Sequence, residues 1–351
     1  MRGPRARHPR SAPARDVTPL RLAPIEPAHA DAAFALFRGA YLRARRANPL
    51  LPGLTPDHEA RLRGRVERAC AHGGVAAWRG PALRGYLVTS PPFDFRGARA
   101  ALVPEYAHAE ADDEPTEVIA ALYGAVADRL VRDGVPLHLI GHFTADVRAT
   151  AMLFDLGFGA IVRERLRDLA DVRVADEARG RHEAALARVE RVPITARWDA
   201  FAPIAAEHAA CYRASPVFVR KDESLGAAAE ELEAQRAAGD ALFVARADGA
   251  PVAYLVVGRC EGAGEGRLLA GSTTAQVRSA YTRPAHRRQG IAGALLQHAV
   301  TWARVRGYER LFVEHETANP LGAAFWARHF APFVTFSLRS IDRRLLPLDE
   351  A

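Results

Sequence analysis

The chain has 351 residues, 49% of them hydrophobic, which is enough for two domains at about 150 residues each. No run approaches the roughly 20 apolar residues that span a bilayer, and the N-terminus lacks the apolar region of a signal peptide, so we expect a cytoplasmic protein without a membrane partner. Three scattered cysteines without a Cys-x-x-Cys pair exclude a disulfide framework and a zinc finger, and they are expected to be core thiols.

The net charge of +7 is concentrated at the N-terminus, where residues 1–16 carry five arginines against Asp16 and so account for +4. The rest of the chain is only mildly basic and has no basic stripe interleaved with aromatic residues. We expect a disordered basic tail over 1–16, and a nucleic-acid partner is not favoured. A nucleic-acid-associated regulator stays open only because of this tail.

The first half alternates strand and helix signals. In chain order they are a strand at 17–22, a helix at 28–45, a Pro-rich loop "NPLLPGLTPDH", strands at 83–89 and 98–106, a helix at 116–132, the strand "PLHLIGH", a short helix ending "LFDLGFG" and a strand at 160–166. Residues 169–191 are charged and weakly periodic, which predicts a linker.

The second half repeats this order. It comprises the opening "VPITARW", helices to about residue 236, two strands in "ALFVARADGAPVAYLVV", the strand "TAQVRSAYT", a long helix from Ile291, the strand "RLFVEHE", the short helix "LGAAFWARH" and the strand "FVTFSLRSI". The pattern predicts an α+β fold in tandem, with domains at 17–168 and 192–343 and a C-terminal tail at 344–351.

The loop before the long helix suits an anion. In "RRQGIAG" (287–293), the helix start presents unpaired N–H groups and the positive end of the helix dipole. Gly290 lets the backbone approach a ligand, and the guanidiniums of Arg287 and Arg288 attract a negative charge. The alternative is that the glycine merely caps the helix, but a plain helix start prefers Ser, Thr, Asp or Asn.

The order of strand, R-x-x-G-x-A loop (Arg287, Gly290, Ala292), long helix, strand, and Asn before a short helix resembles the acetyl-CoA core of the GNAT superfamily of N-acetyltransferases. The resemblance implies two tandem GNAT-like domains, each a mixed, mostly antiparallel sheet flanked by helices. It also implies acetyl-CoA as cosubstrate, no metal, and an amine acceptor. The cofactor contacts that it implies are Ala280, Tyr281, Thr282, Arg287, Arg288, Gln289, Gly290, Ile291, Ala292, Gly293, Asn319 and Trp326.

The first half departs from the family pattern. Asp146 stands in the place of the family's Asn and Leu153 in that of its usual Tyr. Where the pyrophosphate loop belongs, the sequence reads "EADDEPTE", whose carboxylates would repel a polyanion by about 1 to 4 kcal/mol each. We therefore expect a degenerate first copy that does not bind acetyl-CoA and a competent second copy.

Acetyl transfer needs a neutral amine, a polarised carbonyl and a proton for the leaving thiolate. Glu314 and His315 are candidate bases and Tyr281 is a third, although a hydrogen-bonded core His and solvated glutamates are the preferred interpretation. Trp326 stands where many family members have a Tyr, and an indole cannot supply a proton at neutral pH. Either another group or solvent is the acid, or the chain is a non-catalytic acyl-CoA-binding or scaffold protein.

Two motifs are set aside. His138 and His142 have the spacing of a helical zinc pair, but on a strand four residues span about 13 Å. The glycines of "GAGEG" (262–266) lie between strands, which favours a hairpin loop over a dinucleotide site.

The acceptor, a small molecule or peptide, is expected at loops such as "NPLLPGLTPDH" and "SPVFVRKDESLG". The sequence determines neither its identity nor the oligomeric state.

Overall fold

The structure is a computed structural model that describes residues 18–114, 117–170, 185–186 and 188–347. The predicted basic tail, most of the predicted linker and the end of the predicted C-terminal tail therefore lie outside the described residues. Within the described part, no helix is both long and apolar enough to cross a bilayer.

The first half contains four elements that the sequence did not predict, α2, β2, β4 and β6. Its elements are β1 (Arg21–Ile25), α1 (Ala30–Ala47), α2 (Pro56–His72), β2 (Gly74–Arg79), β3 (Ala82–Leu87), β4 (Phe93–Phe95), β5 (Ala98–Val103), β6 (His108–Glu110), α3 (Glu117–Arg132), β7 (Leu137–Phe143), α4 (Val147–Asp155) and β8 (Gly159–Asp168). The end of the predicted Pro-rich loop is the start of α2, where the Thr55 hydroxyl accepts from the His58 N–H and Pro56 occupies the first turn.

In the second half, β12 and β13 coincide with the predicted strands. The elements are β9 (Val189–Arg191), α6 (Ala202–Cys211), α7 (Leu225–Ala237), β10 (Ala241–Ala247), β11 (Ala250–Arg259), β12 (Thr274–Thr282), α8 (Ile291–Val305), β13 (Arg310–Glu316), α9 (Pro320–His329) and β14 (Ala331–Ser340). The segment "VPITARW" contains no strand, and the first strand of this half is β9, which lies inside the predicted linker and pairs with β10.

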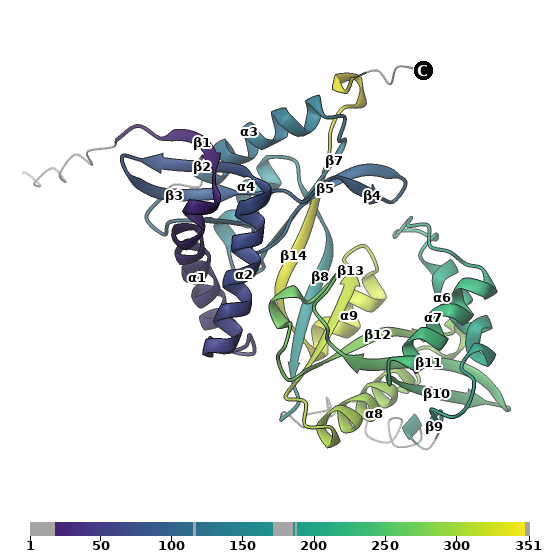
Figure 1. Cartoon of the computed structure of the whole chain (residues 1–351). Coiled ribbons are helices and arrows are strands. Elements are labelled where there is room, and N and C mark those ends of the chain that lie inside the picture. Colours follow the sequence, from purple (N-terminus) through teal and green to yellow (C-terminus); the bar gives the residue numbers. More distant parts are fainter. Residues whose placement is uncertain (1–17, 115–116, 171–184, 187, 348–351) are drawn as a thin grey trace, which may run out of the picture.

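The two halves share one sheet because their last strands are exchanged (Figure 1). A four-stranded sheet has the order β1-β2-β3-β6, and a ten-stranded sheet has the order β4-β5-β7-β14-β8-β13-β12-β11-β10-β9. Strand β14 of the second half pairs with β7 of the first, β8 of the first half pairs with β13 of the second, and β8 and β14 pair with each other. The tandem α+β prediction is confirmed, but the sheets are joined, not separate.

Each half contains a short parallel pairing whose strands then separate. Strand β5 pairs with β7 only over residues 100–103 and 137–140, and β12 pairs with β13 only over residues 274–277 and 310–313. On β12 the separation begins at a bulge, because Val257 and Val256 of β11 pair with Val277 and Ser279 and leave Arg278 as an extra residue. The bulge bends β12 away from β13.

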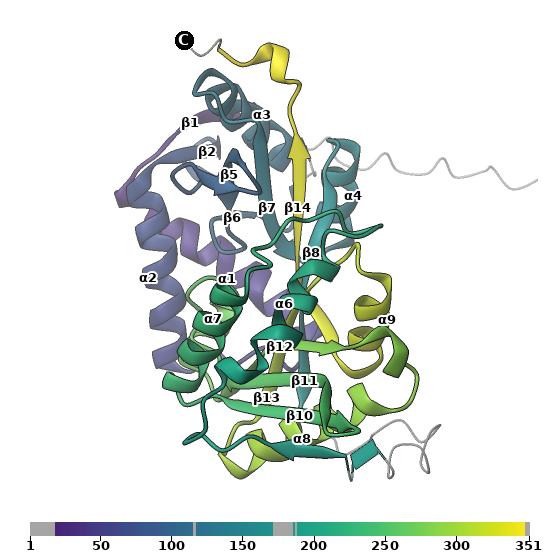
Figure 2. The ribbon, with the colours of Figure 1, turned by 90° about the vertical axis from the view of Figure 1, so that its right-hand side faces the viewer.

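Helices cover both faces of the second half's sheet (Figure 2). Helix α8 packs on β10, β11 and β12 from one side, and α6 and α7 lie on the other. The apolar residues Ile291, Leu295, Ala299 and Trp302 form the buried face of α8, whereas Val305 is 80% exposed because the helix ends there.

Candidate functional site

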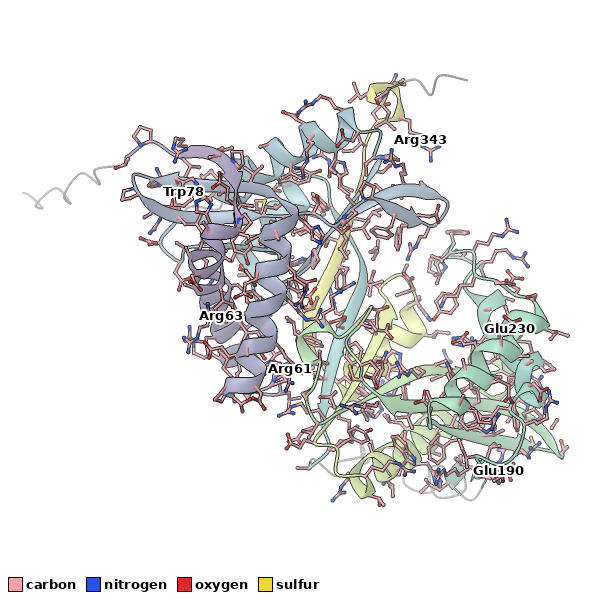
Figure 3. The ribbon with its side chains drawn as sticks, in the orientation of Figure 1. Arg61, Arg63, Trp78, Glu190, Glu230 and Arg343 are labelled. Carbon is pink, nitrogen blue, oxygen red and sulfur yellow. The ribbon has the colours of Figure 1, made fainter. Side chains whose placement is uncertain are left out.

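A pocket of about 400 Å³ opens where β12 and β13 separate. Its walls come from β12, β13, α6, α7 and the start of α9; in Figure 3 the label Glu230 marks α7. The lining side chains that matter below are His208, Tyr212, Glu231, Tyr254, Arg278, Ser279, Ala280, Glu314, His315, Glu316, Asn319 and Trp326. The pocket therefore combines three of the predicted cofactor contacts with the two predicted bases on β13.

The predicted anion loop has an open helix start. Arg288 has φ 60° and Gly290 φ 81°, so two left-handed residues turn successive amides toward one side. The first backbone bond into the helix runs from the Ala294 N–H to the Gly290 carbonyl (3.0 Å), and no side chain among the described residues caps the helix. The N–H groups of the first turn of α8 are therefore available to an anion.

The side chains of this loop differ in how exposed they are to solvent. Arg287 is half-buried and donates from Nε to the Thr282 carbonyl (3.0 Å), which ties the loop to the end of β12. Arg288 and Gln289 are exposed, and Gln289 donates to the Ala285 carbonyl (3.3 Å). Residues 287–293 do not line the pocket; they lie beyond the far end of β12, whose Ala280 does line it.

Asn319 and Trp326 both line the pocket and both have structural contacts. The Asn319 Oδ1 accepts from the Gly322 N–H (3.1 Å) and caps α9. Asp146 caps α4 in the same way through the Ala149 N–H (2.9 Å), so the two halves correspond at this point. Trp326 is 8% exposed and packs edge-on against Phe330 with 5.4 Å between ring centroids.

Glu314 lies at the boundary of two cavities. It lines the pocket and also a second cavity of about 260 Å³ walled by the "GAGEG" loop, which connects β11 and β12 as the predicted hairpin. Its carboxyl interacts with that of Glu265, which lines the second cavity beside it. Burial, and then the Glu265 carboxyl, raise the pKa of Glu314 to about 8.

The other two candidate bases, His315 and Tyr281, are hydrogen-bonded to other residues of the protein. The His315 Nε2 accepts from the Arg165 Nε (2.9 Å), so Nδ1 carries the proton and faces the Glu316 carbonyl (3.1 Å). Burial lowers the pKa of His315. Tyr281 is buried, accepts from the Cys211 Sγ (3.5 Å), and burial raises its pKa. These contacts favour structural roles for both residues.

His208 is a pocket residue that sequence reasoning missed. Its ring stacks on Tyr281 with 5.3 Å between centroids, and its Nδ1 lies 2.9 Å from the Tyr254 hydroxyl. Burial, and then the positive charge of Lys221, lower its pKa to about 3. A single histidine among alanines on α6 has no motif, so only the fold brings it into the pocket.

The first half reaches the pocket through the turn between β4 and β5. The Arg96 Nη2 donates to the Glu316 Oε1 (2.7 Å), and the Arg96 guanidinium lies over the Phe95 ring at 4.8 Å from its centroid. Arg96 has φ 54°, which places it at the tip of this turn. A residue of the first half thus contacts a lining residue of the second half's pocket.

The corresponding gap in the first half is bridged by its own side chains. The His108 Nε2 donates to the Gly141 carbonyl (2.7 Å) across the space between β6 and β7. In the acidic segment, Glu114 accepts from Arg79 (2.9 Å) and Arg84 (2.7 Å). Further pairs join Asp112 to Arg43 and Asp113 to Arg84. Arginines therefore offset the charge of three of the carboxylates from which we expect repulsion of a polyanion.

Other predictions concern cysteines and metals. Cys70 and Cys260 are buried free thiols, whereas Cys211 is only half-buried. His138 and His142 lie on strand β7, as the sequence indicates. Among the described ranges, no group of three or more His, Cys, Asp or Glu side chains is arranged to hold a metal ion.

The chain is similar to known proteins in both sequence and fold. The sequence model of the acetyltransferase (GNAT) family matches residues 204–330. A GCN5-related N-acetyltransferase from Sphaerobacter thermophilus is similar in fold, with a TM-score of 0.55 and 15% identity over 93% of this chain and 96% of that chain.

Two further solved structures match. The GCN5-related glucosamine N-acetyltransferase region of a fungal multi-domain GH3 β-N-acetylglucosaminidase has a TM-score of 0.54 and 13% identity; 92% of this chain is covered, but it spans only 38% of that chain. A tandem GNAT protein from the clavulanic acid biosynthesis pathway has a TM-score of 0.46 and 16% identity over 94% of this chain and 100% of that one. None of the curated proteins matches the sequence. Residues 204–330 therefore match the acetyltransferase (GNAT) family, and the chain has the fold of the GCN5-related N-acetyltransferase from Sphaerobacter thermophilus.

Proposed function

We propose that the protein transfers an acetyl group from acetyl-CoA to an amine of a small-molecule or peptide acceptor, and that it does so in the cytoplasm, the compartment favoured by its free cysteines. The observation that carries this proposal is the pocket between the separated strands β12 and β13, with Glu314 in its wall. Acetyl-CoA supplies the acyl group in an activated form, as a thioester.

The residues at the two ends of β12 fit acetyl-CoA. The open N–H groups at the start of α8, with Arg287 and Arg288, suit its diphosphate because a helix N-terminus binds anions. The unpaired edge of β12 at Ala280 offers backbone groups to the pantetheine arm, and Asn319 and Trp326 flank the place expected for the thioester.

Glu314 is the base that we propose. A primary amine has an ordinary pKa near 10.4, about 7 units above that of His208 but only about 2 units above that of Glu314. At 1.36 kcal/mol per unit, proton transfer to His208 is uphill by about 10 kcal/mol and transfer to Glu314 by about 3 kcal/mol. Burial is the largest cause of both shifts, and it weakens the imidazole as a base and strengthens the carboxylate.

The first half contributes to the part of the pocket where we expect the acceptor. Arg96 contacts Glu316 in the pocket wall, whereas the first half's own strand gap is bridged by His108. We therefore propose one acetyl-CoA site per chain, in the second half, with the first half as a degenerate copy that shapes the acceptor pocket. The carboxylates of Glu231 and Glu316 in that pocket favour an acceptor that arrives as an ammonium ion.

The test is acetyl-CoA turnover with a panel of primary amines, followed as free thiol release with mass detection of the acetylated product. Glu314→Gln, which keeps the side-chain shape, should bind acetyl-CoA with unchanged affinity and lose most of the turnover. Tight binding without turnover for every amine would show instead that the chain is an acyl-CoA-binding protein.

A further inference from the structure

The transfer reaction must export one proton from the pocket. An ammonium acceptor carries three protons on nitrogen; as the C–N bond forms and the C–S bond breaks, the amide keeps one proton and the thiolate sulfur takes one. The third has to reach solvent in every turnover. With the pocket filled by both substrates, the proton needs a path that does not run through them.

The second cavity offers such a path. It lies behind Glu314 and is walled by Gln276, Arg278 and the loop residues 261–265. In that loop Glu261, Ala263 and Gly264 are exposed, so the cavity leads to solvent on the far side of Glu314. Arg278 also lines both cavities, but a guanidinium stays charged and cannot carry the proton.

Glu265 is held in place to receive the proton. The Gln276 Nε2 donates to the Glu265 Oε1, and the Gln276 Oε1 accepts from the Arg278 Nη1 (3.0 Å), which fixes the orientation of the amide. Arg278 is in turn paired with Asp240 (3.3 Å) and donates to the Arg259 carbonyl (2.7 Å). The network holds the Glu265 carboxyl in the cavity that Glu314 also lines.

A hydrogen bond between two carboxyl groups requires a proton between them, because ionised carboxylates only accept. We propose that Glu265 and Glu314 share one proton at the boundary of the two cavities, and that Glu265 relays to solvent the proton that Glu314 takes from the acceptor. This inference rests on the proposed function, and Glu265 acts through Glu314 without touching substrate.

The surroundings of Glu314 support a shared proton. The titratable or charged groups that face it are Glu265 and Arg267 from the loop after β11, Arg278 from β12, Glu316 from β13, Glu164 opposite on β8, and Tyr212 at the end of α6. Carboxyl groups outnumber the two arginines, and Arg278 is already paired with Asp240. Burial and this excess of carboxyl groups together raise the pKa of Glu314.

The experiment compares Glu265→Gln with Glu261→Gln, a matched control on the same cavity wall whose side chain is exposed. For Glu265→Gln we expect unchanged acetyl-CoA affinity, a kcat lower by on the order of 10- to 100-fold, and an inflection of kcat against pH at lower pH than in the wild type. Glu265→Asp, which keeps a carboxyl group, should recover part of the loss. Glu261→Gln should match the wild type.

A titration without turnover tests the pair separately from the proposed function. Carbon-13 NMR of labelled glutamate carboxyls in the full chain should show one group that titrates well above the ordinary range; it should vanish in Glu314→Gln and move to lower pH in Glu265→Gln. Unchanged kcat and unchanged titration in Glu265→Gln, or equal effects in Glu261→Gln, would overturn the relay. If no amine is turned over, the proposed function fails and the titration still decides whether the proton is shared.

Discussion

Substitution of Gly290 tests the anion loop most directly. Gly290→Asp places a carboxylate at the start of α8, where we expect the diphosphate of acetyl-CoA, while Gly290→Asn adds a side chain of nearly the same size without the charge. Both must adopt φ 81°, a left-handed conformation that costs a non-glycine residue about 1 to 2 kcal/mol and less for Asp or Asn. That strain is common to both variants, so their difference isolates the charge.

The charge term is large enough to measure. Two unit charges at about 4 Å repel by about 1 kcal/mol in water and by about 4 kcal/mol at an effective dielectric of 20. Gly290→Asp should therefore bind acetyl-CoA roughly 5- to 1,000-fold more weakly than Gly290→Asn, and the difference should shrink at high salt. Isothermal calorimetry gives both dissociation constants, and circular dichroism checks that the fold is kept. Equal affinity of the two folded variants would refute the placement of the diphosphate at this loop.

Three further predictions follow from the same geometry. Calorimetric titration should give one acetyl-CoA per chain, because His108 bridges the first half's strand gap; two equivalent sites would contradict a degenerate copy. Trp326→Ala should lower the free energy of unfolding by up to about 3 to 5 kcal/mol and weaken acetyl-CoA binding, whereas Trp326→Tyr should keep the aromatic wall and retain single-turnover activity; the reverse order of activities would place Trp326 away from the thioester. The pKa of Glu114 is lowered, and the hydrogen bond from Arg79 is the largest cause. The ionised Glu114 therefore stabilises the fold fully above its ordinary pKa of 4.5, and this stabilisation is lost as the pH falls through the lowered pKa. The melting temperature of Glu114→Gln should accordingly be lower than that of the wild type at neutral pH and approach it in acid; a constant difference at every pH would contradict this linkage.

Local sequence signals predicted the elements around the cofactor loop. The alternation in "TAQVRSAYT" and "RLFVEHE" and the apolar spacing from Ile291 depend only on neighbouring residues, and β12, β13 and α8 form where these patterns indicate. The start of α2 also depends on neighbouring residues, since Thr55, Pro56 and an acidic first turn are a helix-start signal. The predicted Pro-rich loop is therefore too long at its end, because its last residues belong to α2.

The site depends on residues that are far apart in the chain. Glu265 and Glu314 come from a hairpin loop and a strand, His208 from α6, and Arg96 from the other half, and no spacing along the sequence relates them. Their pKa values also require tertiary structure, because burial is the largest cause of the shifts at Glu314 and His208.

The amino-acid sequence by itself determined the tandem order of strands and helices, the open start of α8 and the family resemblance, because each rests on short-range patterns of polarity and backbone preference. Only the tertiary structure decided that β8 and β14 are exchanged between the halves, since the choice of a strand's partner depends on the whole sheet and not on the residues of that strand alone. It also decided which carboxyl groups meet at the boundary of the two cavities, because burial and proximity in space, not position in the chain, determine their proton affinity.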